Sequence, residues 1–192
     1  MDPMARPDTS QRILDIAERL VQTRGYNGFS YADIAEAMRI TKASLHYHFP
    51  AKADLGARLI ERYERNFLAA LERIDAEGKD VRDKLRRYAA LYEEVLRDNR
   101  MCLCGMLAAE FGTLPKPMRE DMRHFFDENE RWLIGILREG RREKVLKFSG
   151  APAEVAQSLI GTLEGAMMIA RSYGDVARFK AVSDRVLGDL GA

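Results

Sequence analysis

One short stretch of the chain carries basic and hydrogen-bonding side chains but no carboxylate. No Asp or Glu lies between Glu36 and Asp54, which makes this the longest acid-free interval in the sequence. A carboxylate beside a phosphate costs Coulomb energy, so contact with a phosphate backbone needs such an interval. The basic residues and hydrogen-bonding aromatic residues in it are Arg39, Lys42, His46, Tyr47, His48 and Lys52. These residue types suit a surface that meets nucleic acid.

A second stretch, Met101 to Phe111, gathers soft side chains around a single charge, Glu110. Met, Cys and aromatic side chains adapt their shape, as a cavity for an apolar or electrophilic molecule requires. A charge in an apolar run needs a partner if it is buried. The alternative is ordinary core packing, which accounts for most such residues. The expected ligand-binding residues are Tyr88, Tyr92, Cys102, Met106, Glu110, Phe125, Trp132 and Met167.

The two cysteines, Cys102 and Cys104, predict neither a disulfide nor a metal site. Residues two apart on a helix point ~200° apart, which is outside bridging geometry. His46 and His48 diverge in the same way, so we expect no metal ion and no cofactor. A reactive thiolate at Cys102 would need a helix N-terminus or a nearby cation, such as Arg97 or Arg100. The alternative is an inert buried thiol.

The elements that position these residues are helices, because apolar residues recur at helical spacing along almost the whole chain. The pattern predicts an all-α protein of about nine helices, with Ser30 and Thr41 as N-caps and Gly25 as a stop signal. The expected helices cover residues 8–24, 31–38, 42–49, 51–75, 81–95, 102–111, 118–140, 153–173 and 176–187. Residues 45–49 also alternate as a strand would, but Thr41 before them and Pro50 after them favour a helix.

Two short helices joined by a tight turn, after a longer helix, form a helix-turn-helix candidate. The alternative is a plain three-helix bundle. On a helical wheel, Leu45 and Phe49 face the core, whereas Ala43 and Tyr47 point outward. We expect phosphate contacts from Lys42, His46, Tyr47, His48 and Lys52. Base edges or a thymine methyl would be touched by Ala43 and Ser44, with Tyr47 or Lys42 as further candidates. The full set of expected DNA-binding residues is Ser30, Tyr31, Thr41, Lys42, Ala43, Ser44, His46, Tyr47, His48 and Lys52.

Residues 10 to 60 closely resemble the N-terminal domain of TetR/AcrR-type transcriptional regulators. Three blocks carry the resemblance: Gly25-Tyr26-x-x-Phe29-Ser30, Ile34-Ala35 and Tyr47-His48-Phe49-x-x-Lys52. The resemblance implies nine helices, a homodimer and a variable C-terminal domain that binds an inducer and releases DNA.

Two positions depart from that family pattern. Arg39 stands in the turn where Gly is common, so a positive φ is expected at a non-glycine residue. His46 stands where Tyr is common, which affects the expected phosphate contact. The 101–111 stretch also resembles the Cys-Leu segment of family members that respond to electrophiles, with Cys102 at the matching position.

We expect three parts: a DNA-binding domain over residues 1–50, a connecting helix over 51–78, and a ligand-binding and dimerisation domain over 79–192. Small residues recur at steps of four along the helix expected over residues 153–173, so another helix can approach closely. That helix belongs either to a second subunit or to the same chain. The expected dimer-interface residues are Ser158, Gly161, Thr162, Gly165 and Ala166.

Composition excludes several classes of protein. The chain has 31 Lys+Arg, 30 Asp+Glu and 46% hydrophobic residues, which fits neither a membrane protein nor a disordered one. The first ten residues include Asp2 and Asp8 and form no signal peptide, so we expect a cytoplasmic protein without a membrane partner. A net charge of +1 predicts weak binding to non-specific DNA and reliance on paired half-sites.

The sequence contains no phosphate-binding glycine loop, nucleophile elbow or paired-histidine metal motif, so an enzyme is not expected. We therefore predict a ligand-responsive DNA-binding regulator. It would be a repressor released from a palindromic operator by a small molecule, with electrophiles as one candidate class. The alternative is a helical protein-interaction module with a degenerate helix-turn-helix.

Overall fold

The computed structural model describes residues 8–191. Most of the segment that we expect not to be a signal peptide therefore lies outside the described residues. The described part of the chain forms nine α-helices and one 3-10 turn, which confirms the all-α prediction. The elements are α1 (Thr9–Arg24), α2 (Tyr31–Met38), α3 (Lys42–His48), α4 (Lys52–Glu77), α5 (Val81–Arg97), α6 (Leu103–Ala109), η1 (Phe111–Thr113), α7 (Lys116–Arg142), α8 (Pro152–Tyr173) and α9 (Val176–Asp189).

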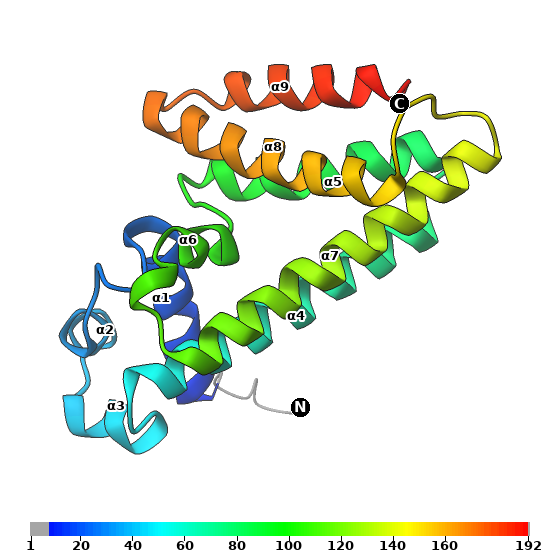
Figure 1. Ribbon diagram of the computed structural model, residues 1–192. Coiled ribbons are helices and arrows are strands. Elements are labelled where there is room, and N and C mark those ends of the chain that lie inside the picture. Colours follow the sequence, from blue (N-terminus) through cyan, green and yellow to red (C-terminus); the bar gives the residue numbers. More distant parts are fainter. Residues whose placement is uncertain (1–7, 192) are drawn as a thin grey trace, which may run out of the picture.

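The helices form two groups joined by a long pair (Figure 1). Helices α1, α2 and α3 lie at one end, and α5, α8 and α9 lie at the other. Helices α4 and α7 run side by side in the same direction between the two groups, while α6 packs on α1. Helix α4 therefore connects the two groups. One of its ends lies at the group of α1, α2 and α3 (the recognition unit), and the other lies beside the bundle of α5, α8 and α9.

Local signals fix the N-terminal unit. Ser30 and Asp33 form a reciprocal capping box at the start of α2, and the Thr41 hydroxyl accepts the N–H of Ser44 at the start of α3. Arg39 ends α2 in the left-handed conformation, with φ 56°, as its place in a turn that favours glycine predicts. For a residue with a Cβ this conformation costs about 1–2 kcal/mol.

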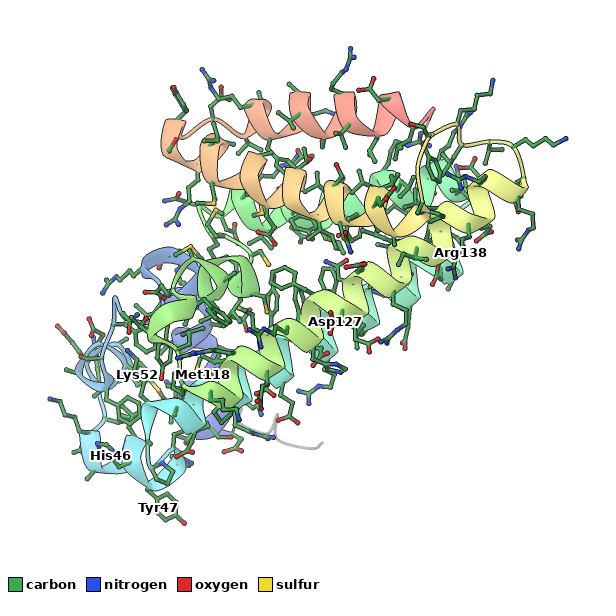
Figure 2. All side chains as sticks on the ribbon, viewed as in Figure 1. His46, Tyr47, Lys52, Met118, Asp127 and Arg138 are labelled. Atoms are coloured by element: carbon green, nitrogen blue, oxygen red, sulfur yellow. The ribbon has the colours of Figure 1, made fainter. Side chains whose placement is uncertain are left out.

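A glycine on one of the two long helices leaves room for a side chain of the other. A Cβ at Gly56 of α4 would lie 2.5 Å from the sulfur of Met118 on α7. Met118 is buried beneath the N-terminal unit, at the start of α7 (Figure 2). A residue with a Cβ at Gly56 would therefore require the end of the Met118 side chain to move.

The helix expected over residues 102–111 is shorter in the structure. Cys102 is its N-cap, and α6 ends at Ala109, followed by the turn η1 and by Pro115 before α7. The cause is Gly112 and Pro115, which do not continue a helix well. None of the helices in the described residues is long and apolar enough to cross a membrane.

Candidate DNA-binding surface and ligand cavity

Helix α3 has one buried face and one free face, as the helical wheel predicted. Leu45 and the C-cap Phe49 are buried in the core of the N-terminal unit. Tyr47 is 84% exposed and points away from the molecule (Figure 2). Lys42 and Ala43 are exposed as well, and Ser44 is half-buried. The free face of α3 thus presents a cation, a methyl group, a hydroxyl and a phenol.

The residues around α3 have different tasks. Ser30 and Thr41 are exposed, and their hydroxyls cap helices. Tyr31 is buried, and its hydroxyl donates to the main-chain oxygen of Phe49 at 2.8 Å, so it fixes the end of α3. This placement differs from the expectation that Tyr31 faces DNA, because its hydroxyl is already bonded inside the fold.

The two histidines of α3 are not equivalent. His46 is exposed, and its Nδ1 lies 3.0 Å from the oxygen of Pro50, which can only accept a hydrogen bond. Nδ1 therefore carries a proton, and Nε2 is left for an outside partner. His48 is half-buried, and its ring packs edge-on against Tyr47 at 5.3 Å.

Lys52 does not reach outward as expected. Its Nζ donates to the main-chain oxygens of Tyr26, at 2.5 Å, and of Phe29. It also lies over both aromatic rings, at 4.6 and 4.1 Å. Burial lowers the pKa of Lys52. The amino group therefore locks the α1–α2 turn onto the start of α4, because two carbonyls and two ring faces satisfy it inside the fold (Figure 2).

A cavity of about 260 Å³ lies between α4, α5 and α8, beside the N-cap of α6. Of the expected ligand-binding residues, Tyr92, Cys102 and Met167 line it. Further residues line the cavity that the sequence did not predict, among them Glu18, Tyr63, Asn66, Phe67, Arg73 and Glu94. Tyr63 and Phe67 fall on the regular apolar stripe of α4, a pattern that is the same for a core residue and for a cavity wall.

Three of the expected ligand-binding residues lie behind the cavity wall or beside it. Tyr88 is buried, and its hydroxyl donates to Asn129 Oδ1 at 2.8 Å. Phe125 is buried and packs against Phe67. Trp132 stacks on Tyr88 and lines a separate shallow groove. These residues support Tyr92 and Phe67 and do not themselves line the cavity.

Met106 and Glu110 lie elsewhere too. Met106 belongs to a second shallow pocket together with Arg171. Glu110 accepts the main-chain N–H groups of Tyr26, at 2.5 Å, and Asn27, at 3.1 Å. The charge of Glu110, the single charge in the apolar stretch, is thus stabilised by two N–H groups of the turn between α1 and α2. We call this arrangement the Glu110 clamp, because it ties α6 to the N-terminal unit.

Two further contacts support the Glu110 clamp. The side-chain amide of Asn27 donates to Thr113 Oγ1 at 2.7 Å. Arg171 of α8 donates to the main-chain oxygen of Thr23 at 2.6 Å. The bundle therefore grips the C-terminal end of α1 and the turn that follows it from both α6–η1 and α8.

Cys102 has only part of the environment expected for a reactive thiol. It is the N-cap of α6, and its Sγ accepts the N–H of Gly105 at 3.4 Å. Burial raises the pKa of the Cys102 thiol well above its usual range, and the Glu164 carboxylate adds to the rise. The cations expected to activate it bond elsewhere: Arg97 pairs with Glu93, and Arg100 pairs with Asp98.

One face of α8 is apolar and open. Met168, Ile169 and Tyr173 are more than half exposed, and a Cβ at Gly161 or Gly165 would meet no described atom within 4 Å. The other expected interface residues divide: Ser158 is exposed and Thr162 half-buried, whereas Ala166 is buried in this chain's own core. Ala166 therefore lies on the inward side of α8, away from the open face.

Comparison with known sequences matches both halves of the chain. Residues 13–59 match the profile described as bacterial regulatory proteins, tetR family. Residues 81–186 match the profile described as tetracyclin repressor-like, C-terminal domain. The chain is 26% identical over 185 residues to the HTH-type transcriptional repressor NemR of Escherichia coli (strain K12), and the match covers 90% of each protein.

Solved structures show the same architecture. A TetR-family transcriptional regulator from Agrobacterium tumefaciens superposes with a TM-score of 0.92 at 33% identity, covering 95% of this chain and 97% of that one. The reduced form of E. coli NemR superposes with a TM-score of 0.79 at 26% identity, covering 93% and 95%. The chain therefore belongs to the TetR family of bacterial regulatory proteins, and it is a DNA-binding transcriptional regulator rather than an enzyme.

Proposed function

We propose that this protein is a homodimeric repressor that binds a palindromic operator through α3 and leaves it when a small molecule occupies the α4–α5–α8 cavity. The observation that carries the proposal is the free face of α3, with Tyr47 84% exposed on an otherwise well-packed unit. Apart from its edge contact with His48, this tyrosine buries little of its surface in the fold, so a contact with an outside partner explains its position better.

The contacts to DNA divide by chemistry. Ala43, Ser44 and Tyr47 lie on the free face of α3. In the major groove these side chains would contact base edges and thymine methyl groups. Lys42 and His46 flank that face; Lys42 suits phosphates, and His46 would donate to one through Nε2 when that nitrogen is protonated as well. The acid-free interval surrounds all five, so no carboxylate of this segment opposes the backbone.

A two-fold symmetric dimer would match the symmetry of a palindromic operator. The open apolar face of α8 suits a second copy of itself, because close approach is possible at Gly161 and Gly165. Two α3 helices related by a two-fold axis would then read half-sites about 34–36 Å, or a multiple of that, apart.

Release requires that the cavity and the recognition unit influence each other. Tyr63 and Phe67 line the cavity from α4, whose N-terminal end Lys52 ties to the α1–α2 turn. The Glu110 clamp provides a second connection to the same turn. A ligand that prefers one arrangement of α4 and α6 by about 1–3 kcal/mol would be sufficient to change operator affinity strongly.

A second candidate concerns the type of inducer. Cys102 lines the cavity with its sulfur at the N-cap of α6, so a molecule in the cavity can meet the thiol. An electrophile that bonds to it would act as the inducer. Cys104 is buried in the core and does not line the cavity.

The direct experiment measures binding of the purified protein to its own promoter region and to random DNA over a range of salt concentrations. We expect much tighter binding to one palindromic segment of the promoter region than to random DNA, and loss of that preference in Tyr47→Ala. Equal binding to both DNAs would favour the protein-interaction module, in which α3 meets a protein.

A further inference from the structure

Glu164 of α8 is a carboxylate in an unusual place, between α8 and α6. Its Oε1 is buried and finds no hydrogen-bond partner among the described residues. Its Oε2 lies against Gly105 of α6, where an added Cβ would be only 2.2 Å away. Gly105 thus leaves the space that the carboxylate fills. A buried charged group without a cation costs free energy, so its presence needs a reason.

The thiol of Cys102 shares this space. Its Sγ accepts the N–H of Gly105, the residue against which Glu164 Oε2 lies. Two side chains act on the pKa of this thiol: the Glu164 carboxylate raises it, and the Tyr63 hydroxyl lowers it. Cys102 and Tyr63 both line the cavity. A nucleophile, a proton acceptor and a hydrogen-bond donor therefore meet at the cavity wall, an arrangement typical of an activated nucleophile.

The other titratable groups around Glu164 do not supply a positive charge. Tyr63 of α4, Tyr88 and Tyr92 of α5, and Cys104 of α6 are the groups that sense its charge, besides Cys102. Arg171, farther along α8, directs its guanidinium to Thr23 and Met106. Among these side chains, the Cys102 thiol is the one that lowers the pKa of Glu164, whereas burial raises it.

We propose that Cys102 and Glu164 form a thiol-addition site in the cavity, in which Glu164 removes the thiol proton as Cys102 bonds to an α,β-unsaturated carbonyl compound. This inference rests on the electrophilic inducer proposed above. The S–H bond breaks and its proton moves to Glu164, while a sulfur electron pair forms the bond to the β-carbon. The electrons of the C=C bond move toward the carbonyl oxygen, and the resulting enolate takes the proton back from Glu164. No oxidant or reductant is needed.

Because the Cys102 thiol is protonated near neutral pH, its reaction needs a nearby base such as the Glu164 carboxylate. Burial raises the pKa of the Cys102 thiol well above its usual range, so thiolate is scarce near neutral pH. Burial also raises the pKa of Glu164, to about 7. A carboxyl group poised near neutral pH is suited to accept a proton during bond formation, whereas a strongly acidic one is a poorer base.

The test measures the rate at which N-ethylmaleimide alkylates Cys102, by intact-protein mass spectrometry from mildly acidic to alkaline pH. The background is Cys104→Ser, so that Cys102 is the only thiol. The rate is expected to rise with the ionisation of Glu164 and to level off above neutral pH. Glu164→Gln should lower the neutral-pH rate on the order of 100-fold. In that variant the rate should keep rising, about tenfold per pH unit, as thiolate forms.

Two further variants are compared with the parent and Glu164→Gln. Glu72→Gln removes an exposed carboxylate of α4 and should keep the parent profile. Gly105→Ala keeps Glu164 but occupies the space of its Oε2, and it should slow alkylation as Glu164→Gln does. If Glu164→Gln does not fold, Gly105→Ala decides.

Parallel pH profiles for the parent and Glu164→Gln would overturn the inference. Failure of N-ethylmaleimide to modify Cys102 in the parent would overturn it together with the electrophilic inducer. In that case operator binding and its loss in Tyr47→Ala would still support the repressor.

Discussion

Replacing Glu110 with alanine removes both oxygens of the Glu110 clamp. A hydrogen bond to a charged group contributes about 1.5–3 kcal/mol. The bond from the Tyr26 N–H is half-buried and belongs in this range, whereas the bond from the Asn27 N–H is exposed and contributes less. We therefore expect the variant to lose about 2–3 kcal/mol in free energy of unfolding.

The same change should affect communication between the cavity and α3. Coupling free energies between two sites are typically about 1–3 kcal/mol, so the loss of a connection of similar size removes much of the response. The ligand-free variant should bind the operator about as tightly as the parent, because Glu110 bonds to the α1–α2 turn and not to α3. The ratio of operator affinities without and with N-ethylmaleimide should fall about tenfold.

Denaturant titration measures the stability, and fluorescence anisotropy with a labelled operator measures the response. Glu143→Ala is the matched control, since Glu143 is an exposed carboxylate at the end of α7. A stability loss in Glu110→Ala below about 0.5 kcal/mol, the level of an ordinary surface change, would refute the energetic reasoning. An unchanged response in a destabilised variant would refute the communication role alone.

Four further predictions address other parts of the molecule. Tyr47→Ala should weaken specific operator binding by about 1–3 kcal/mol while melting is unchanged, and equal affinity in anisotropy titrations would remove α3 from the account. Lys52→Ala should lower stability by about 1.5–3 kcal/mol and leave the salt dependence of DNA binding unchanged, since its amino group bonds inside the fold; a reduced salt slope would indicate a phosphate contact. Ile169→Glu, on the open face of α8, should yield monomers in sedimentation, and an intact dimer would place the interface elsewhere. Glu164→Gln should gain stability relative to the parent as pH rises from 5 to 8. Folding raises the pKa of Glu164 to about 7, so its ionisation costs the folded state about 3 kcal/mol by neutral pH; a constant difference in denaturant titrations would contradict this.

The recognition unit could be predicted from the sequence because its signals are local. Caps at Ser30 and Thr41, and the alternation of buried and exposed positions along α3, determine which face is free. The positive φ of Arg39 followed from its place in the turn. Each of these features depends on residues within one or two helical turns.

The placement of Lys52, Glu110 and the cavity wall could not be predicted in the same way. Glu110 bonds to a turn 84 residues earlier in the chain, and nothing in its own segment specifies that partner. Lys52 occurs in a basic interval, and only the folded turn supplies the carbonyls that hold it. Periodicity places Phe125 and Phe67 on inward faces alike, but only the packing decides that Phe67 borders empty space.

The central claim is that two α3 helices of one dimer read two half-sites at a fixed separation. It is tested by anisotropy titration of the operator against a version with about half a helical turn of DNA inserted between its half-sites, roughly five base pairs. The dimer account predicts that the insertion lowers affinity to the level of a single half-site. Equal affinity for both DNAs would contradict it.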